Sequence, residues 1–146
     1  MTSVQQFCTF FLGEFYLGVE VRKVQEVLRY QEMTRVPLAP GVVSGLINVR
    51  GQIVMAIDLR RRLQLPDRPH DLLPTNVIVH TDEAAVSLLV DELCDVLELD
   101  GSTLQPPPDT LDALTRDLIV GVHMLHDRML LILGTDRIAN LGATKE

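Results

Sequence analysis

The stretch Gly45–Leu63, with the sequence GLINVRGQIVMAIDLRRRL, gives the clearest prediction of the fold. It begins with an apolar strand, Gly45–Val49, turns at Arg50-Gly51-Gln52 and continues through the almost wholly apolar strand Ile53–Ile57. A strand that is apolar throughout is usually covered on both faces, so we expect this stretch in the middle of the fold. At the turn, the long cation Arg50 stands where a tight turn favours a small polar residue, which makes it a candidate functional residue.

The sequence on either side of this stretch predicts strands and very little helix. Short apolar runs recur along the chain with turn residues about every 8–12 positions, the spacing of β-sandwiches and small barrels. The pattern predicts roughly ten strands and a mostly β fold, with similar hairpin pairs in each half of the chain. The other predicted hairpins are Val4–Leu12 with Phe15–Glu20, Asn76–His80 with Ala84–Val90, and Leu118–Leu125 with Met129–Leu133.

Helices are predicted only as short pieces. Val21–Val27 has valines at helical spacing, and Leu59–Leu63 follows Asp58, whose carboxylate can accept hydrogen bonds from the first turn. A terminal helix is expected at Thr135–Leu141, with Thr135 as its cap and with Ile138 and Leu141 docked on the core.

One segment predicts a boundary within the chain. Pro66–Pro74 contains three prolines and little apolar content, so we place the division between two sub-structures there. We expect a single domain over residues 1–146, with one subdomain at about 12–65, completed by the termini, and a second at about 75–134. Leu111–Asp117 is polar and is predicted to be irregular.

Charge and composition restrict the kind of partner. The chain has 146 residues, is 47% hydrophobic and carries a net charge of −7, which argues against a nucleic-acid binder. Residues 1–65 contain eight Lys and Arg against five Asp and Glu, whereas residues 66–146 contain five against fifteen. A mildly basic half and an acidic half give the molecule two different faces, although acidic loops can also serve solubility alone.

The sequence has no recognisable catalytic or metal-binding motif. Neither G-x-x-x-x-G-K-[ST] nor G-x-G-x-x-G occurs. His123 and His126 flank a hairpin turn without a further ligand at metal-binding spacing, so solvated or structural histidines are expected. Cys8 and Cys94 lie far apart in apolar patterns and are predicted to be buried free thiols. We therefore expect no metal, no cofactor and no enzymatic activity.

The N-terminal sequence MTSVQQF has no basic region followed by an apolar core, so we predict no signal peptide. No apolar run approaches the ~20 residues needed to span a bilayer. We expect a cytoplasmic protein with no direct membrane insertion.

Several motifs together resemble those of a known family. The most diagnostic is Gly45-Leu46-Ile47-Asn48-Val49-Arg50-Gly51 followed by Asp58-Leu59-Arg60, which fits the pattern G-x-x-N-x-R-G…D-L-R. Further matches are Leu12-Gly13-Glu14 through Leu17-Gly18-Val19-Glu20-Val21, Lys23-Val24-Gln25-Glu26-Val27, Val36 with Pro40, Ile53-Val54, Val90-Asp91, Asp95-Val96-Leu97 and Asp127-Arg128-Met129-Leu130. In these motifs, over nearly its whole length, the chain resembles the CheW family of chemotaxis coupling proteins.

The resemblance implies both a fold and a role. The implied fold is two small five-stranded SH3-like β-barrels that share a hydrophobic core, with short helices. The implied role is a non-enzymatic adaptor that couples the cytoplasmic tip of chemoreceptors to the regulatory domain of the histidine kinase CheA. Other CheW-like subunits are further candidate partners. An alternative is a CheW-like adaptor in a chemotaxis-like pathway that controls surface motility or another output.

On this resemblance we expect two binding surfaces. The receptor-binding surface is expected at Val24, Glu26, Val27 and Arg50, because an apolar groove with a cation at its rim suits a helical hairpin. The kinase-binding surface is expected at Gly45, Asn48, Asp58, Val77 and Val96. The competing hypothesis, a small-molecule binder or enzyme, requires a convergent polar cluster that the sequence does not show.

Overall fold

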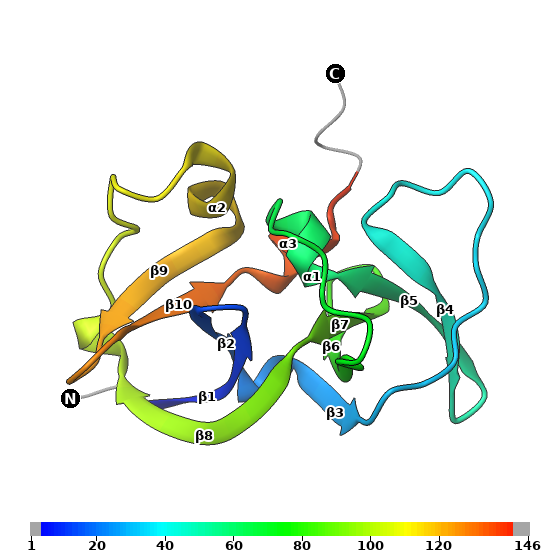
Figure 1. Cartoon of the computed structure of the whole chain (residues 1–146). Helices are drawn as coiled ribbons and strands as arrows, with labels where there is room; N and C mark the ends of the chain where they lie inside the picture. Colours follow the sequence, from blue (N-terminus) through cyan, green and yellow to red (C-terminus); the bar gives the residue numbers. More distant parts are fainter. Residues whose placement is uncertain (1–3, 142–146) are drawn as a thin grey trace.

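The protein's strands form two five-stranded sheets in the computed structural model, which describes residues 4–141 (Figure 1). Sheet A contains β1 (Val4–Leu12), β2 (Phe15–Glu20), β8 (Glu92–Asp100), β9 (Ile119–Met124) and β10 (Met129–Leu133). Sheet B contains β3 (Val24–Leu28), β4 (Val43–Val49), β5 (Gln52–Asp58), β6 (Thr75–His80) and β7 (Ala85–Val90). The predicted mostly β fold with two five-stranded units is confirmed.

The two sheets share one topology. The strand order is β8-β1-β2-β10-β9 in sheet A and β3-β6-β7-β5-β4 in sheet B. In each sheet the third and fourth strands in this order are parallel, and all other neighbours are antiparallel. Strands β3 to β7 therefore correspond, in order, to β8, β9, β10, β1 and β2, so the hairpin β4–β5 is the counterpart of the hairpin β9–β10.

The chain passes between the two sheets at other positions than the predicted subdomain boundary. The chain passes from sheet A to sheet B after β2 and returns after β7. Pro66–Pro74 leads from α1 to β6 and so lies between two elements of the sheet B half. The division at about 65–75 cuts across sheet B, because strand pairing and not chain punctuation decides which strands share a sheet.

Two of the expected helical pieces are present in shortened form. Helix α1 spans Leu59–Arg62, and the Asp58 carboxylate accepts a hydrogen bond from the Arg60 amide at 3.0 Å, which confirms the predicted cap. Helix α3 spans Thr135–Ala139, but Gly134 occupies the cap position and Thr135 is buried. Leu141 lies outside the helix and is half-buried.

Two other local predictions were wrong. The expected helix at Val21–Val27 is only a 3₁₀ turn, η1 (Val21–Lys23), because Val24 already pairs with sheet B as the first residue of β3. The segment expected to be irregular contains helix α2 (Ala113–Leu118), which the Asp112 side chain caps by accepting from the Thr115 amide at 2.8 Å. A second 3₁₀ turn, η2 (Gly101–Thr103), follows β8.

Three apolar clusters explain why the strands are so apolar. A shared core between the sheets contains Phe10 and Leu17 from sheet A and Ile57 and Leu88 from sheet B. Each sheet also has an apolar cluster of its own on the face turned away from the shared core. These clusters are Ile47, Val49, Val54 and Ile78 in sheet B, and Phe7, Leu130 and Ile132 in sheet A. Strand β5 therefore buries both faces as predicted, while its hairpin partner β4 is an edge strand.

Candidate functional site

Arg50 and Gly51 form the two-residue turn between β4 and β5. Their φ angles are 54° and 88°, and strand pairing extends to Val49 and Gln52 on either side. The Oδ1 atom of Asn48 accepts a hydrogen bond from the Gly51 amide at 2.9 Å, which stabilises the turn. Glycine adopts a positive φ freely, whereas this conformation costs a residue with a Cβ about 1–2 kcal/mol of conformational free energy. Arg50 therefore occupies this turn at a local cost in stability.

The Arg50 guanidinium is held by Glu26 of β3. Its Nε lies 3.2 and 3.1 Å from the two Glu26 carboxylate oxygens, and its Nη2 lies 3.2 Å from Oε1. The hydrogen bonds and negative charge of Glu26 raise the pKa of Arg50. Because β3 and β4 are opposite edges of sheet B, this ion pair shows that the sheet curls back on itself. The Arg50 side chain remains 79% exposed.

Val24 and Val27 face the shared core from edge strand β3. They pair with Val79 and Val77, both fully buried members of that core, and directly opposed residues point to the same side of a sheet. A register shift after Val24 keeps both valines on this side despite their odd spacing. Val27 is still 36% exposed, because β3 is an edge strand of sheet B.

Leu93 and Val96 occupy the matching position on edge strand β8. They pair with Phe10 and Cys8 of β1, which also belong to the shared core. Nevertheless Leu93 is 41% exposed and Val96 is 54% exposed. The edge strands β3 and β8 run along the same lower side of the molecule in Figure 1.

The shared core therefore has an uncovered apolar border along its two edge strands. We call it the apolar margin and define it by Val24, Val27, Leu93 and Val96. Val96, expected in the kinase-binding set, lies on this margin with Val24 and Val27, which were expected to bind the receptor. Leu93 was not predicted as a binding residue, because the sequence marks it only as one apolar position in a strand pattern.

Three of the residues expected to bind the kinase are inside the fold. Gly45 is needed for a close approach, since a Cβ there would lie 2.7 Å from the carbonyl oxygen of Thr34, whose backbone pairs with Leu46. Val77 is fully buried in the shared core, and the Asp58 side chain is only 13% exposed. Asn48 is exposed on the β4–β5 hairpin, where its pairing partner Ile53 is 61% exposed.

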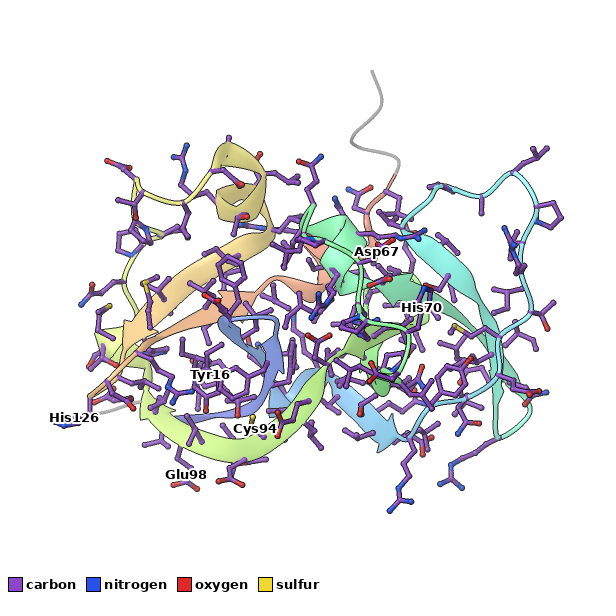
Figure 2. The ribbon with its side chains drawn as sticks, in the orientation of Figure 1. Tyr16, Asp67, His70, Cys94, Glu98 and His126 are labelled. Atoms are coloured by element: carbon purple, nitrogen blue, oxygen red, sulfur yellow. The ribbon has the colours of Figure 1, made fainter. Side chains whose placement is uncertain are left out.

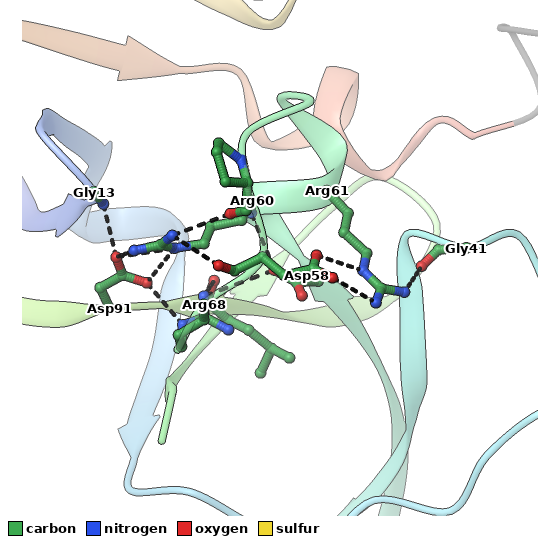
Figure 3. Close-up of polar contacts among 10 residues, drawn as sticks. Gly13, Gly41, Asp58, Arg60, Arg61, Arg68 and Asp91 are labelled. Atoms are coloured by element: carbon green, nitrogen blue, oxygen red, sulfur yellow. Dashed lines mark hydrogen bonds and ion pairs between the residues drawn. The ribbon is translucent and has the colours of Figure 1, made fainter. Parts of the chain in front are cut away.

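A buried charge cluster connects the two sheets around Asp91. Its carboxylate accepts hydrogen bonds from Arg60 Nη2 at 2.6 Å, from Arg68 Nε at 2.7 Å and from the Gly13 amide at 2.7 Å (Figure 3). Arg68 also lies 3.7 Å from Asp58. Burial raises the pKa of Asp91, but the hydrogen bonds from Arg60, Gly13 and Arg68 outweigh it, so the pKa is lowered overall.

This cluster gives a structural role to two of the sequence motifs. Gly13 belongs to the β1–β2 turn of sheet A, whereas Arg60 follows β5 of sheet B and Asp91 follows β7. The motifs Asp58-Leu59-Arg60 and Val90-Asp91 therefore meet at the junction between the sheets. Arg68 completes the cluster although its sequence context gave no sign of it.

The other two arginines of the basic run are also used within the chain. Arg61 pairs with Asp67 at 3.1 Å and donates to the Gly41 carbonyl at 3.2 Å. Arg62 is buried and donates to the backbone carbonyls of Ile138 and Arg137 at 2.9 and 3.0 Å, which ties α1 to α3. Burial lowers the pKa of Arg62. The side chain of Arg50 is more exposed than those of Arg60, Arg61 and Arg62.

Within residues 4–141 no three His, Cys, Asp or Glu side chains are grouped to hold a metal ion. His123 is buried, with its Nδ1 atom 2.9 Å from the Thr103 hydroxyl, and burial lowers its pKa. Cys8 and Cys94 are free thiols, but only Cys8 is fully buried. No helix in the same part of the chain is long and apolar enough to cross a membrane.

Known proteins share this sequence pattern and fold. A family model described as the CheW-like domain matches residues 6–142. The chain is 30% identical over 137 residues to chemotaxis protein CheW of Klebsiella aerogenes, covering 94% of this chain and 82% of that protein. It is 28% identical over 118 residues to protein FrzA of Myxococcus xanthus, covering 79% and 72% of the two chains.

A solved structure gives the same result. The scaffolding protein TtCheW from Thermoanaerobacter tengcongensis superposes with a TM-score of 0.86 at 25% identity, over 99% of this chain and 98% of that one. The match extends across both sheets, so the sequence motifs and the complete fold agree. The chain belongs to the CheW-like domain family.

Proposed function

We propose that the chain couples the cytoplasmic tip of chemoreceptors to the regulatory domain of the histidine kinase CheA. The observation that carries this proposal is the apolar margin, where Val27, Leu93 and Val96 leave part of the shared core exposed. Exposed apolar side chains grouped along one border of a core are typical of a protein-binding surface. Similarity to chemotaxis proteins named CheW supports the same role.

The apolar margin is the proposed receptor-binding surface. An amphipathic helix binds by placing its apolar face against such a border, and a receptor tip is a helical hairpin. Glu26 of β3 and Arg50 of the β4–β5 turn form an ion pair between the two edges of sheet B, and we assign them to contacts with polar residues at the rim of the helix. This assignment keeps Val24, Glu26, Val27 and Arg50 together and adds Val96 to them.

The face of the β4–β5 hairpin that carries Asn48 and Ile53 is the proposed kinase-binding surface, whereas Arg50 in the turn between them is assigned to the receptor side with Glu26. Asn48 and Ile53 present side chains to solvent there. Gly45 and Asp58 lie at the other end of the same hairpin, so they would act by shaping sheet B from within, and Val77 would act by supporting Val27 from the core. Separate surfaces for receptor and kinase allow one molecule to hold both partners.

Multivalency would strengthen these contacts in an array. Individual interactions of small surfaces are modest, but linked binding events raise the effective concentration of each partner. Other CheW-like subunits could take part in the same array. A pathway that controls surface motility would use the same surfaces, and co-purification with the native receptor distinguishes that output from flagellar chemotaxis.

The proposal is tested by the single change Val96→Asp. It places a charge on the apolar margin at a position that is 54% exposed, so the fold should tolerate it. We expect the affinity for a receptor cytoplasmic fragment, measured by isothermal titration calorimetry, to fall at least about tenfold, the effect of losing a central contact. Binding of the kinase regulatory domain should stay within about twofold of the parent.

Leu73→Asp is the matched control, because Leu73 is 59% exposed but lies in the loop before β6. It should leave both affinities unchanged. Equal receptor binding by the parent and Val96→Asp would remove the apolar margin from the proposal. Failure of the parent to bind either fragment would contradict the adaptor function itself.

A further inference from the structure

The shared topology of the two sheets gives Arg50 a counterpart. The hairpin β9–β10 occupies the place in sheet A that β4–β5 occupies in sheet B, at the edge and beside a parallel neighbour. Each hairpin carries one arginine at its turn: Arg50 in sheet B and Arg128 in sheet A. The two arginines therefore stand at equivalent places of the two sheets.

The Arg128 guanidinium is held by two aromatic rings, whereas that of Arg50 is held by a carboxylate. Its guanidinium carbon lies 5.2 Å from the ring centre of Phe11 and 5.0 Å from that of Tyr16. Phe11 and Tyr16 are paired residues of β1 and β2, and their ring centres are 5.1 Å apart. Figure 2 shows Tyr16 on sheet A, away from sheet B. Stacking on two rings orders the guanidinium while leaving its N–H edges available.

The hydrogen-bonding edge of Arg128 is unused within residues 4–141. Its one ion pair joins Nε to Asp127 Oδ1 at 3.6 Å, which is too long for a hydrogen bond. In contrast, Arg50 donates three hydrogen bonds to Glu26. The Arg128 side chain is 43% exposed, so its remaining donors can reach a partner. An ordered arginine with free donors is typical of an interface hot spot.

The surroundings of Arg128 restrict what it can bind. The guanidinium borders a surface concavity of about 390 Å³ whose lining includes Phe15 and Met129 as well as Glu14 and Asp127. The two acidic side chains repel a phosphate or a run of acidic residues, because like charges at close range disfavour binding. The apolar side chains favour a partner with apolar residues around its point of contact.

We infer that Arg128 is a second cationic docking site, which binds one Asp or Glu carboxylate that a protein partner presents among apolar side chains. A carboxylate pairs with the two terminal nitrogens of a guanidinium in a planar, bidentate contact. The inference rests on the proposed adaptor function, since it assigns a second sheet to partner binding. It gives the chain one arginine contact per sheet.

The test compares Arg128→Gln and Arg128→Lys with the parent, using the kinase regulatory domain and a receptor cytoplasmic fragment as separate titrants in calorimetry. For at least one titrant, Arg128→Gln should weaken binding roughly tenfold, the effect of losing a charge-assisted bidentate contact. Arg128→Lys should recover only part of this loss, because an ammonium group neither forks nor stacks in the same way. Full recovery of binding in Arg128→Lys would show that only the positive charge matters, which would contradict the bidentate contact.

Arg116→Gln is the matched control. Arg116 is exposed on α2, and within residues 4–141 its side chain donates to the Leu111 carbonyl alone. It should leave both affinities unchanged, and thermal unfolding should be the same for all four proteins. Arg128→Gln within about twofold of the parent for both titrants would overturn the inference while leaving the adaptor function standing. A parent that binds neither titrant would overturn both.

Discussion

Arg50 and Glu26 connect the two edges of sheet B. Glu26 lies on β3 and Arg50 on the turn after β4, and these strands stand at opposite ends of the strand order. The carboxylate of Glu26 is mostly covered, whereas the arginine is mostly exposed, at 18% and 79% of their side chains. The pair therefore fixes the direction of a cation that remains accessible to a partner.

Reversing the charge of Arg50 tests whether this cation binds a partner. Arg50→Glu should keep the fold, because an exposed ion pair contributes little to stability. It should weaken assembly of the receptor–kinase complex in pull-downs, since it replaces a docking cation with a negative charge. Arg22→Glu is the control, because Arg22 is 77% exposed and also pairs with a glutamate, Glu20. Unchanged assembly with Arg50→Glu would return Arg50 to a purely local role.

Gly45→Ala should destabilise the fold through a backbone contact. The added Cβ would lie 2.7 Å from the Thr34 carbonyl oxygen, so the segment that pairs with β4 must move. We expect the free energy of unfolding in urea to fall by roughly 1–3 kcal/mol, the usual cost of overpacking. Gly41→Ala is the control, because a Cβ at Gly41 meets no atom within 4 Å. Equal stabilities for the two variants would contradict this account of Gly45.

Asp91→Asn should destabilise the junction between the sheets. It removes the charge that compensates Arg60 and Arg68, and an uncompensated buried charge costs roughly 3 kcal/mol. For a domain of this size, the melting temperature should fall by about 6–12 °C in calorimetry. Asp127→Asn, at an exposed turn, should change it little. A melting temperature within 1–2 °C of the parent, about the size of a surface effect, would show that the cluster does not hold the sheets together.

His123 should make the protein less stable as the pH falls below neutral. Its pKa is lowered in the folded state, so the unfolded state binds a proton first as the pH passes through about 6.5. Below that pH, stability should decrease by at most about 1.4 kcal/mol per pH unit until the folded state is also protonated. His123→Gln should flatten the dependence of the urea-unfolding free energy on pH between neutral pH and about pH 5. The same slope in the parent and in His123→Gln would contradict this assignment.

The sequence predicted local pairing better than it predicted the grouping of strands. The turn at Arg50, the cap at Asp58 and the hairpin β9–β10 each depend on neighbouring residues, and the structure confirms them. The division at Pro66–Pro74 did not follow the sheets, because membership of a sheet depends on pairing between distant segments. No spacing rule indicates that β8 returns to pair with β1.

The site residues show the same limit. Val24 and Val27 were expected on a helix, because valines three apart fit that period, but a register shift in β3 produces the spacing in a strand. Val77 and Val96 have the same side chain and lie in similar strand patterns, yet one is fully buried and the other 54% exposed. The difference comes from the strand's place in its sheet: β6 has neighbours on both sides, whereas β8 is an edge.

The most direct test of the adaptor proposal is sedimentation of a receptor cytoplasmic fragment and a kinase regulatory domain with and without this chain. If the chain couples the two partners, a single species containing all three proteins should form, and neither partner should sediment with the other when the chain is absent. If receptor and kinase instead compete for the chain, so that only binary complexes are seen, the two proposed surfaces are not separate. That result would contradict the central claim.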